Sequence, residues 1–210
     1  MSMAVAADRI NEIPARSDRV LRHAGVDRLF HWLTAVSVLT LMSTGLLPHV
    51  GVQFDWVPIH WITGFALAAL VIFHVLRSVI WRRLRAMWFS IAELRTHQVG
   101  KYSVAQKLMH HAMTVMVLCA VGTGLLMLKK INTPLLVRDP YLFDANTWGV
   151  IYFIHGVAAL SAITLVIVHI YFGLIPENRM YLRAMITGWM SRSEQRARVA
   201  GIRAGDKHLT

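Results

Sequence analysis

The chain has 210 residues, of which 56% are hydrophobic and 16% are charged, and its formal net charge is +11. An ordinary soluble domain is excluded, because the apolar residues form long blocks rather than periodic stripes. The basic residues lie between these blocks, which is typical of membrane-flanking segments, so the charge does not indicate nucleic-acid binding.

Four apolar blocks follow one another along the chain, and each is long enough to cross a hydrocarbon core, which takes roughly 20 residues. They cover residues 29–47, 57–80, 108–128 and 148–174. Lys and Arg number five in residues 1–28, seven in residues 81–107 together with Arg77, and seven in residues 175–210. The other two connections hold none and three. This bias predicts that both termini are cytoplasmic.

The predicted fold class is therefore all-α: an integral membrane four-helix bundle with up-down-up-down topology, located in a bacterial inner membrane. Residues 1–27 are expected to form a cytoplasmic N-terminal tail. Residues 28–175 would form the four-span domain, and residues 176–210 a cytoplasmic interfacial segment and tail.

Histidines recur at the ends of the apolar blocks. His155 and His169 are fourteen positions apart on the fourth block, so on a helix their side chains point nearly the same way, about 21 Å apart along the axis. His60 and His74 have the same spacing on the second block. An imidazole within a membrane span is a functional hypothesis by default.

The two halves of the chain are related. The interval from His31 to Thr44-Gly45 is repeated from His110 to Thr123-Gly124, and each half contains one of the two His pairs spaced by fourteen. Each half is thus predicted to form a helical hairpin, although the TGLL motif by itself is common in apolar helices.

The donor set favours haem iron over other metals. No Asp or Glu lies within the four blocks, which disfavours zinc and di-iron sites, and Cys119 is the single cysteine, which excludes thiolate-held clusters and covalent C-x-x-C-H haem attachment. Histidines on facing helices of a bundle can supply both axial ligands of a haem. We therefore predict two non-covalently bound b-type haems.

The outer haem has one candidate pair, His60 with His155, because only His49 in the first loop also lies near that surface. The inner haem has more candidates than it needs. They are His31, His74, His110, His111 and His169. Proton relay is an alternative role for His74, His110 and His111.

Several motifs occur in the order found in one known family. The chain resembles the membrane cytochrome b (gamma) subunit of respiratory formate dehydrogenase, within the wider di-haem cytochrome b561-like family, over about residues 22–190. The matching motifs are Asp27-Arg28-Leu29-Phe30-His31-Trp32, Ile59-His60, Gly100-Lys101-Tyr102-Ser103-Val104-Ala105-Gln106-Lys107, Ile154-His155 and His169-Ile170-Tyr171.

The resemblance implies an outer haem on His60 and His155 and an inner haem on His31 and His169. His74 is not required by the family pattern, and it permits an alternative inner pair with His169.

The resemblance also implies a quinone pocket beside the inner haem, formed by Tyr102, Ser103, Ala105 and Gln106. Ser103 replaces an Asn of the family pattern, and Ala105 replaces a Gly. Without the resemblance, Ser103 and Gln106 fit a helix capping box equally well.

By the same resemblance, the chain is expected to be the di-haem membrane anchor of a formate dehydrogenase complex rather than its formate-oxidising subunit. It would carry electrons from a periplasmic-side iron–sulfur subunit to menaquinone or ubiquinone near the cytoplasmic side. The implied partners are that subunit, a molybdenum- or tungsten-containing catalytic subunit, quinone and membrane lipid, and a homo-oligomer of the complex is compatible with them.

Two other functions remain open. The first keeps the fold and changes the partner, making the chain a cytochrome b subunit of a hydrogenase or thiosulfate reductase, or a free-standing b561-like quinone oxidoreductase. The second is a haem-free transporter or assembly factor.

Overall fold

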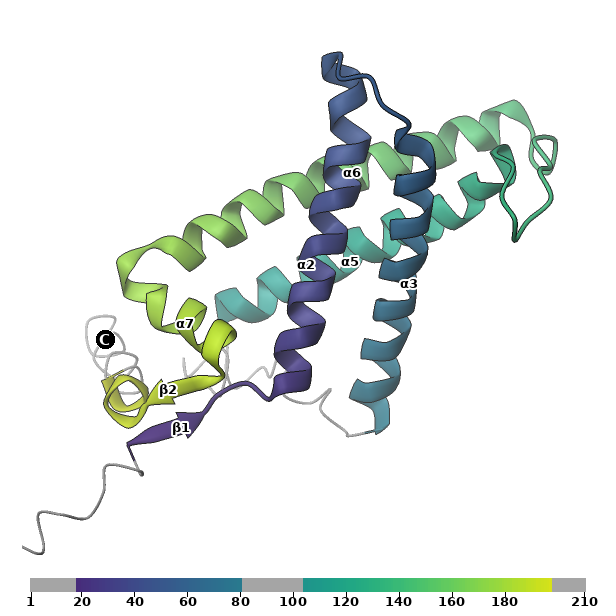
Figure 1. Cartoon of the computed structure of the whole chain (residues 1–210). Helices are drawn as coiled ribbons and strands as arrows, with labels where there is room; N and C mark the ends of the chain where they lie inside the picture. The colour runs from purple at the N-terminus through teal and green to yellow at the C-terminus, as the bar shows by residue number, and fades with distance from the viewer. Residues whose placement is uncertain (1–17, 81–103, 198–210) are drawn as a thin grey trace, which may run out of the picture. The chain divides into compact units, whose positions relative to one another are not determined.

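The computed structural model describes residues 18–80 and 104–197, and these residues are mostly α-helical (Figure 1). The chain divides into two compact units. One unit is Leu29–Phe172, and the other combines Met1–Arg28 with Gly173–Thr210.

The larger unit is built from four long helices: α2 (Gly25–Leu46), α3 (Trp56–Ile80), α5 (Val104–Met127) and α6 (Ala145–Leu174). All four are long and apolar enough to cross a membrane. The mostly helical architecture and the four membrane-capable helices are therefore confirmed. Their up-down order in a membrane and the side on which the termini lie stay predictions.

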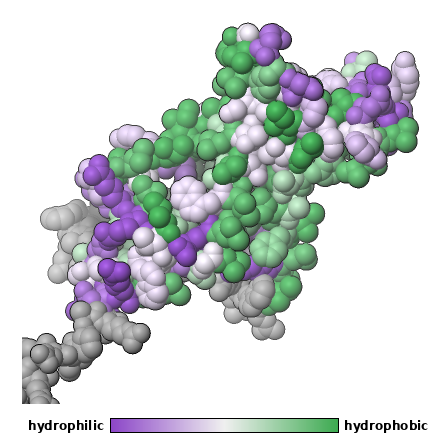
Figure 2. All heavy atoms as spheres, viewed as in Figure 1, coloured by the Kyte–Doolittle hydropathy of each residue, from purple (hydrophilic) through white to green (hydrophobic). Residues whose placement is uncertain are grey.

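The surface of these helices is apolar, as expected for helices that face lipid. Phe153, Leu160 and Ile80 are among the many large apolar side chains that are well exposed. On the face of the molecule seen in Figure 2, hydrophobic residues cover much of the helices and hydrophilic residues gather near their ends. Buried apolar residues of this unit include Leu67, Ala68, Leu128, Trp148, Ile151, Ala158 and Val166. Four of these seven lie on α6, which thus contributes most to this small core.

A polar cap begins α6. The Asp144 carboxylate accepts hydrogen bonds from the backbone N–H of Thr147 at 2.8 Å and from its hydroxyl at 2.9 Å. These bonds, the backbone one above all, hold the pKa of Asp144 below its ordinary value. An ionised cap at this position satisfies N–H groups that have no partner within the helix.

The smaller unit joins two segments that are far apart in the sequence. Strand β1 (Arg19–Leu21) pairs antiparallel with β2 (Trp189–Ser191), with Val20 opposite Met190. Before β2 come a 3-10 turn, η4 (Pro176–Asn178), and the helix α7 (Arg179–Thr187).

A glycine connects α7 to β2. Gly188 has φ +91°, in the left-handed region, and its carbonyl accepts hydrogen bonds from the N–H groups of Arg22 and His23 at 2.8 and 3.2 Å. Arg28 adds a guanidinium hydrogen bond to the carbonyl of Ile186. The segment before α2 is therefore tied to the end of α7 by several hydrogen bonds.

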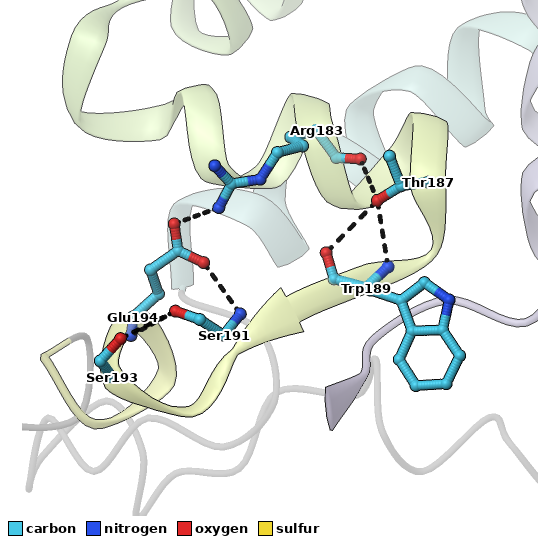
Figure 3. A network of polar contacts seen from close by, with 6 residues as sticks. All are labelled: Arg183, Thr187, Trp189, Ser191, Ser193 and Glu194. Carbon is cyan, nitrogen blue, oxygen red and sulfur yellow. Dashed lines mark hydrogen bonds and ion pairs between the residues drawn. The ribbon is translucent and has the colours of Figure 1, made fainter. Parts of the chain in front are cut away.

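A polar network lies at the end of this unit (Figure 3). Glu194 pairs with the guanidinium of Arg183 and accepts a hydrogen bond from the Ser191 N–H at 2.9 Å. The Thr187 hydroxyl donates to the Arg183 carbonyl at 2.9 Å. The network thus connects α7 to the residues that follow β2.

Candidate functional site

Two pairs of histidine rings face each other across the helices of the larger unit. His60 on α3 and His155 on α6 have ring centres 6.3 Å apart, and His31 on α2 and His169 on α6 have ring centres 6.2 Å apart. The fourteen-residue spacing on α6 separates the two pairs by about 21 Å along that helix. The structure thus places the four histidines implied by the family resemblance in two facing pairs.

The ring separations suit a metal between the two imidazoles. An imidazole nitrogen lies about 2 Å from a transition metal, so two rings bound on opposite sides of one ion hold their centres roughly 6 Å apart. Both observed distances match this value, and the rings of each pair come from different helices. In the described part of the chain, no group of three or more His, Cys, Asp or Glu residues is arranged to hold a metal. Two imidazoles from facing helices suit a haem iron, whose porphyrin would supply the remaining ligands.

The Thr44 hydroxyl is hydrogen-bonded to Nδ1 of His60. That nitrogen lies 2.8 Å from Oγ1 of Thr44, and the Thr44 hydroxyl also lies 2.8 Å from the carbonyl oxygen of Thr40. A carbonyl can only accept, so the single hydroxyl proton of Thr44 is directed to Thr40. With this assignment, Nδ1 of His60 is the protonated nitrogen that donates to Thr44. Nε2 keeps its lone pair and is the nitrogen available to a metal.

The same arrangement occurs in the second half of the chain. Nδ1 of His155 lies 2.9 Å from Oγ1 of Thr123, whose hydroxyl lies 2.6 Å from the carbonyl oxygen of Cys119. The same assignment makes Nδ1 of His155 the donor and leaves Nε2 for a metal. The internal repeat seen in the sequence thus has a structural counterpart, because Thr44 and Thr123 play equivalent parts.

The glycines after these threonines give the rings room. A Cβ added to Gly45 would lie 3.8 Å from Cε1 of His60, and one added to Gly124 would lie 3.4 Å from Cε1 of His155. A larger side chain at either position would meet the ring of a candidate ligand. Both glycines therefore leave space beside the ring of a candidate ligand.

The second pair has different surroundings. Among the described residues, the rings of His31 and His169 have no hydrogen-bond partner, and His31 instead packs edge-on against Trp32 with ring centres 5.3 Å apart. Oγ1 of Thr34, one turn after His31, is buried and also has no hydrogen-bond partner in the described part of the chain.

The remaining intramembrane histidines form a separate cluster. The ring of His74 stacks on Phe30, with ring centres 4.6 Å apart, and lies 6.2 Å from the ring of His110. The His110 ring in turn lies 5.8 Å from that of His111, whose Nδ1 donates to the Lys107 carbonyl at 2.7 Å. His74 thus has a histidine neighbour on α5, whereas the ring facing His169 is that of His31.

The stretch predicted to line a quinone pocket is only partly described. Ala105 and Gln106 lie in the first turn of α5, with Ala105 exposed and Gln106 half-buried. Lys107 beside them is buried. Tyr102 and Ser103 lie outside the described residues.

Four membrane-capable helices, three of which present histidine rings to one another in two pairs, are features of a multi-pass membrane cytochrome. The sequence model of the prokaryotic cytochrome b561 family matches residues 22–188, so the chain belongs to this family. Membership implies haem b as cofactor and electron transport as the general role. It also supports location in the inner membrane, in agreement with the prediction.

Curated relatives have a more specific name. The chain is 22% identical over 198 residues to the protein named formate dehydrogenase, cytochrome b556(fdo) subunit, of Escherichia coli strain K12. The match covers 84% of this chain and 88% of the relative, and the proteins of the same name in strains O6:H1 and O157:H7 match equally well. The predicted resemblance to a formate dehydrogenase cytochrome subunit is thus confirmed.

Proposed function

We propose that the chain is a di-haem b electron-transfer subunit that anchors an oxidoreductase complex in the membrane. The observation that carries this proposal is the pair of ring separations, 6.3 Å for His60 with His155 and 6.2 Å for His31 with His169. Both separations would suit two imidazoles that share one iron.

In the proposed mechanism the four histidines hold the cofactors. His60 and His155 hold the outer haem through Nε2, and His31 and His169 hold the inner one. A haem iron with two imidazole ligands supplies reversible one-electron transfer. The protein would keep neutral imidazoles in place on facing helices. His31 rather than His74 is the proposed inner ligand, because its ring is the one facing His169.

The proposed complex is a formate dehydrogenase. A subunit containing molybdenum or tungsten oxidises formate, and an iron–sulfur subunit passes electrons to this chain on the periplasmic side. The name of the Escherichia coli relatives and the ordered motifs support this assignment. Because the relatives are only 22% identical, a free-standing b561-like quinone oxidoreductase is the second candidate, supported by the family match. Co-purification with iron–sulfur and catalytic subunits from native membranes distinguishes the two.

The electron acceptor in this proposal is a quinone, bound by Tyr102, Ser103, Ala105 and Gln106 near the cytoplasmic side. The position of Ala105 and Gln106 in the first turn of a membrane-capable helix supports a pocket close to the membrane surface. Gln106→Leu is expected to weaken quinone reduction and leave the haem spectrum unchanged. A loss of haem from this variant would instead assign Gln106 a structural role.

The test is a reduced-minus-oxidised visible spectrum with haem quantification on the purified protein. The parent is expected to hold two b-type haems. His31→Ala and His60→Ala should each lose one haem, and the two variants should lose different ones, whereas His74→Ala should keep both. A parent without haem would refute the proposal, and loss of the inner haem in His74→Ala would move that ligand to His74.

A further inference from the structure

The two histidine pairs differ in their hydrogen bonds. Nδ1 of His60 and Nδ1 of His155 each donate to a threonine hydroxyl, on α2 and α5 respectively. No corresponding bond is found for His31 or His169 among the described residues. Both rings of the His60–His155 pair have this hydrogen bond and, within the described residues, neither ring of the other pair has it, so the two sites differ in the bonding of their ligands.

The second nitrogen of a ligating imidazole influences the metal. When Nδ1–H donates a hydrogen bond, the ring orientation and the tautomer are fixed and Nε2 becomes a more basic ligand. A more basic ligand stabilises the ferric form more than the ferrous form, which lowers the reduction potential, and second-shell hydrogen bonding is one of the protein's means of setting that potential. In an apolar helix bundle such a bond is electrostatically stronger than in water.

We propose that Thr44 and Thr123 are positioning residues that lower the reduction potential of the outer haem. Each threonine keeps the proton on Nδ1 of its histidine and directs Nε2 toward the iron. The inference rests on the proposed function, since it assumes a haem at each histidine pair.

The hydroxyls also bond within their own helices, which by itself explains a threonine in an apolar helix. Thr164 provides the matched control. The Thr164 hydroxyl donates to the Leu160 carbonyl at 3.1 Å. The hydroxyls of Thr44 and Thr123 likewise donate to carbonyls four residues earlier. In the described part of the chain, no hydrogen bond joins Thr164 to a histidine. A role limited to the helix predicts equal effects at all three positions.

The experiment is a spectroscopic redox titration of the purified haem-loaded protein. The variants are Thr44→Val and Thr123→Val, which keep the shape and remove the hydroxyl, Thr44→Ser and Thr123→Ser, which keep the hydroxyl, and the control Thr164→Val. Haem content is quantified for each, and the His60→Ala spectrum identifies which of the two transitions belongs to the outer haem. A parent that holds fewer than two haems would refute the proposed function before any threonine variant is compared.

We expect each of Thr44→Val and Thr123→Val to raise the potential of the outer haem and to leave that of the inner haem unchanged. A tenfold change in the ferric-to-ferrous ratio corresponds to about 59 mV for one electron. The serine variants and Thr164→Val should match the parent. A valine variant that loses the outer haem while its serine counterpart keeps it also supports the proposal.

Two results would overturn the proposal. The first is an unchanged outer potential in both valine variants at full haem content. The second is an equal change, in potential or in haem content, in the serine variants or in Thr164→Val. Either result would limit the threonines to packing and to hydrogen bonds within their helices.

Discussion

A Cβ atom on Gly124 would lie 3.4 Å from Cε1 of His155, at the near limit of ordinary van der Waals contact. The equivalent distance from Gly45 to His60 is 3.8 Å. The two glycines follow the threonines that bond the same two rings, so each Thr-Gly pair supports one histidine by a hydrogen bond and leaves space beside it. A larger side chain at either glycine should therefore displace the histidine ring beside it.

Gly124→Val is expected to weaken haem retention at the His60–His155 site by roughly tenfold, since displaced metal ligands and their supports typically cost 10–100-fold in affinity. Gly124→Ala should be tolerated, because a single Cβ fits. Haem content after detergent purification measures the effect. Gly122→Val on the same helix is the control, because a Cβ there meets no atom within 4 Å. Equal haem loss in Gly122→Val would assign the effect to the helix rather than to the ring.

The His74–His110 neighbours give a second prediction. If these residues are not haem ligands, His110→Ala should keep two haems with unchanged spectra, as should His74→Ala. Any effect should appear instead in the rate or pH dependence of quinone reduction, because histidines at this end of α3 and α5 are candidates for proton relay. Loss of one haem in both variants would show that the pair, whose rings lie 6.2 Å apart, holds an iron itself.

The positions of the helices were largely predictable from the sequence, because a lipid-facing span needs a long apolar block whatever its neighbours. The predicted block at 57–80 differs from α3 by one residue at its start. The start of α2 at Gly25 precedes the predicted block by four residues, since Asp27 and Arg28 make the first turn polar. A hydropathy pattern identifies the part of a helix that lipid covers and misses the polar turns beyond it.

The partners of the histidines were only partly predictable. The spacing of His155 and His169 predicted that both lie on the same side of one helix. The partner ring of each histidine depends instead on how the four helices pack, which no local pattern specifies. The hydroxyl bonds of Thr44 and Thr123 were missed, although the repeated Thr-Gly was a usable signal. The pairing of β1 with β2 was not predicted either, because it joins strands of three residues separated by nearly the whole chain. Contacts of such long sequence separation leave little local trace.

Gly188 gives a third prediction, for the smaller unit. It has φ +91°, and a Cβ there would lie 3.1 Å from the carbonyl oxygen of His23. Gly188→Ala should destabilise the β1–β2 pairing by about 1–2 kcal/mol from the backbone conformation alone, with the close contact adding to this cost. Hydrogen exchange of the Arg22 and His23 amides, which donate to the Gly188 carbonyl, reports the loss.

Gly51→Ala is the matched control, because Gly51 has the same φ of +91° and no atom within 4 Å of the added Cβ. Gly51→Ala should carry the free-energy cost of a positive φ without the cost of a close contact. It should leave the hydrogen exchange of the Arg22 amide unchanged. If Gly188→Ala exchanged at the parent's rate, the β1–β2 contact would not depend on the glycine.

Glu194 gives a prediction about pH. The Ser191 N–H and the Arg183 guanidinium hold the pKa of Glu194 below its ordinary value. A carboxyl whose pKa is lowered by folding adds stability that is present above its unfolded pKa of about 4.3 and is lost as the pH falls through the lower folded pKa. The loss should be below about 1 kcal/mol, because the pair is partly exposed. Exchange of the Ser191 amide, corrected for its intrinsic pH dependence, should therefore accelerate as the pH falls through that range.

The control is Glu194→Gln, in which the Ser191 amide should exchange faster at neutral pH and show no acid-dependent step. A step retained in Glu194→Gln would assign the titration to another group.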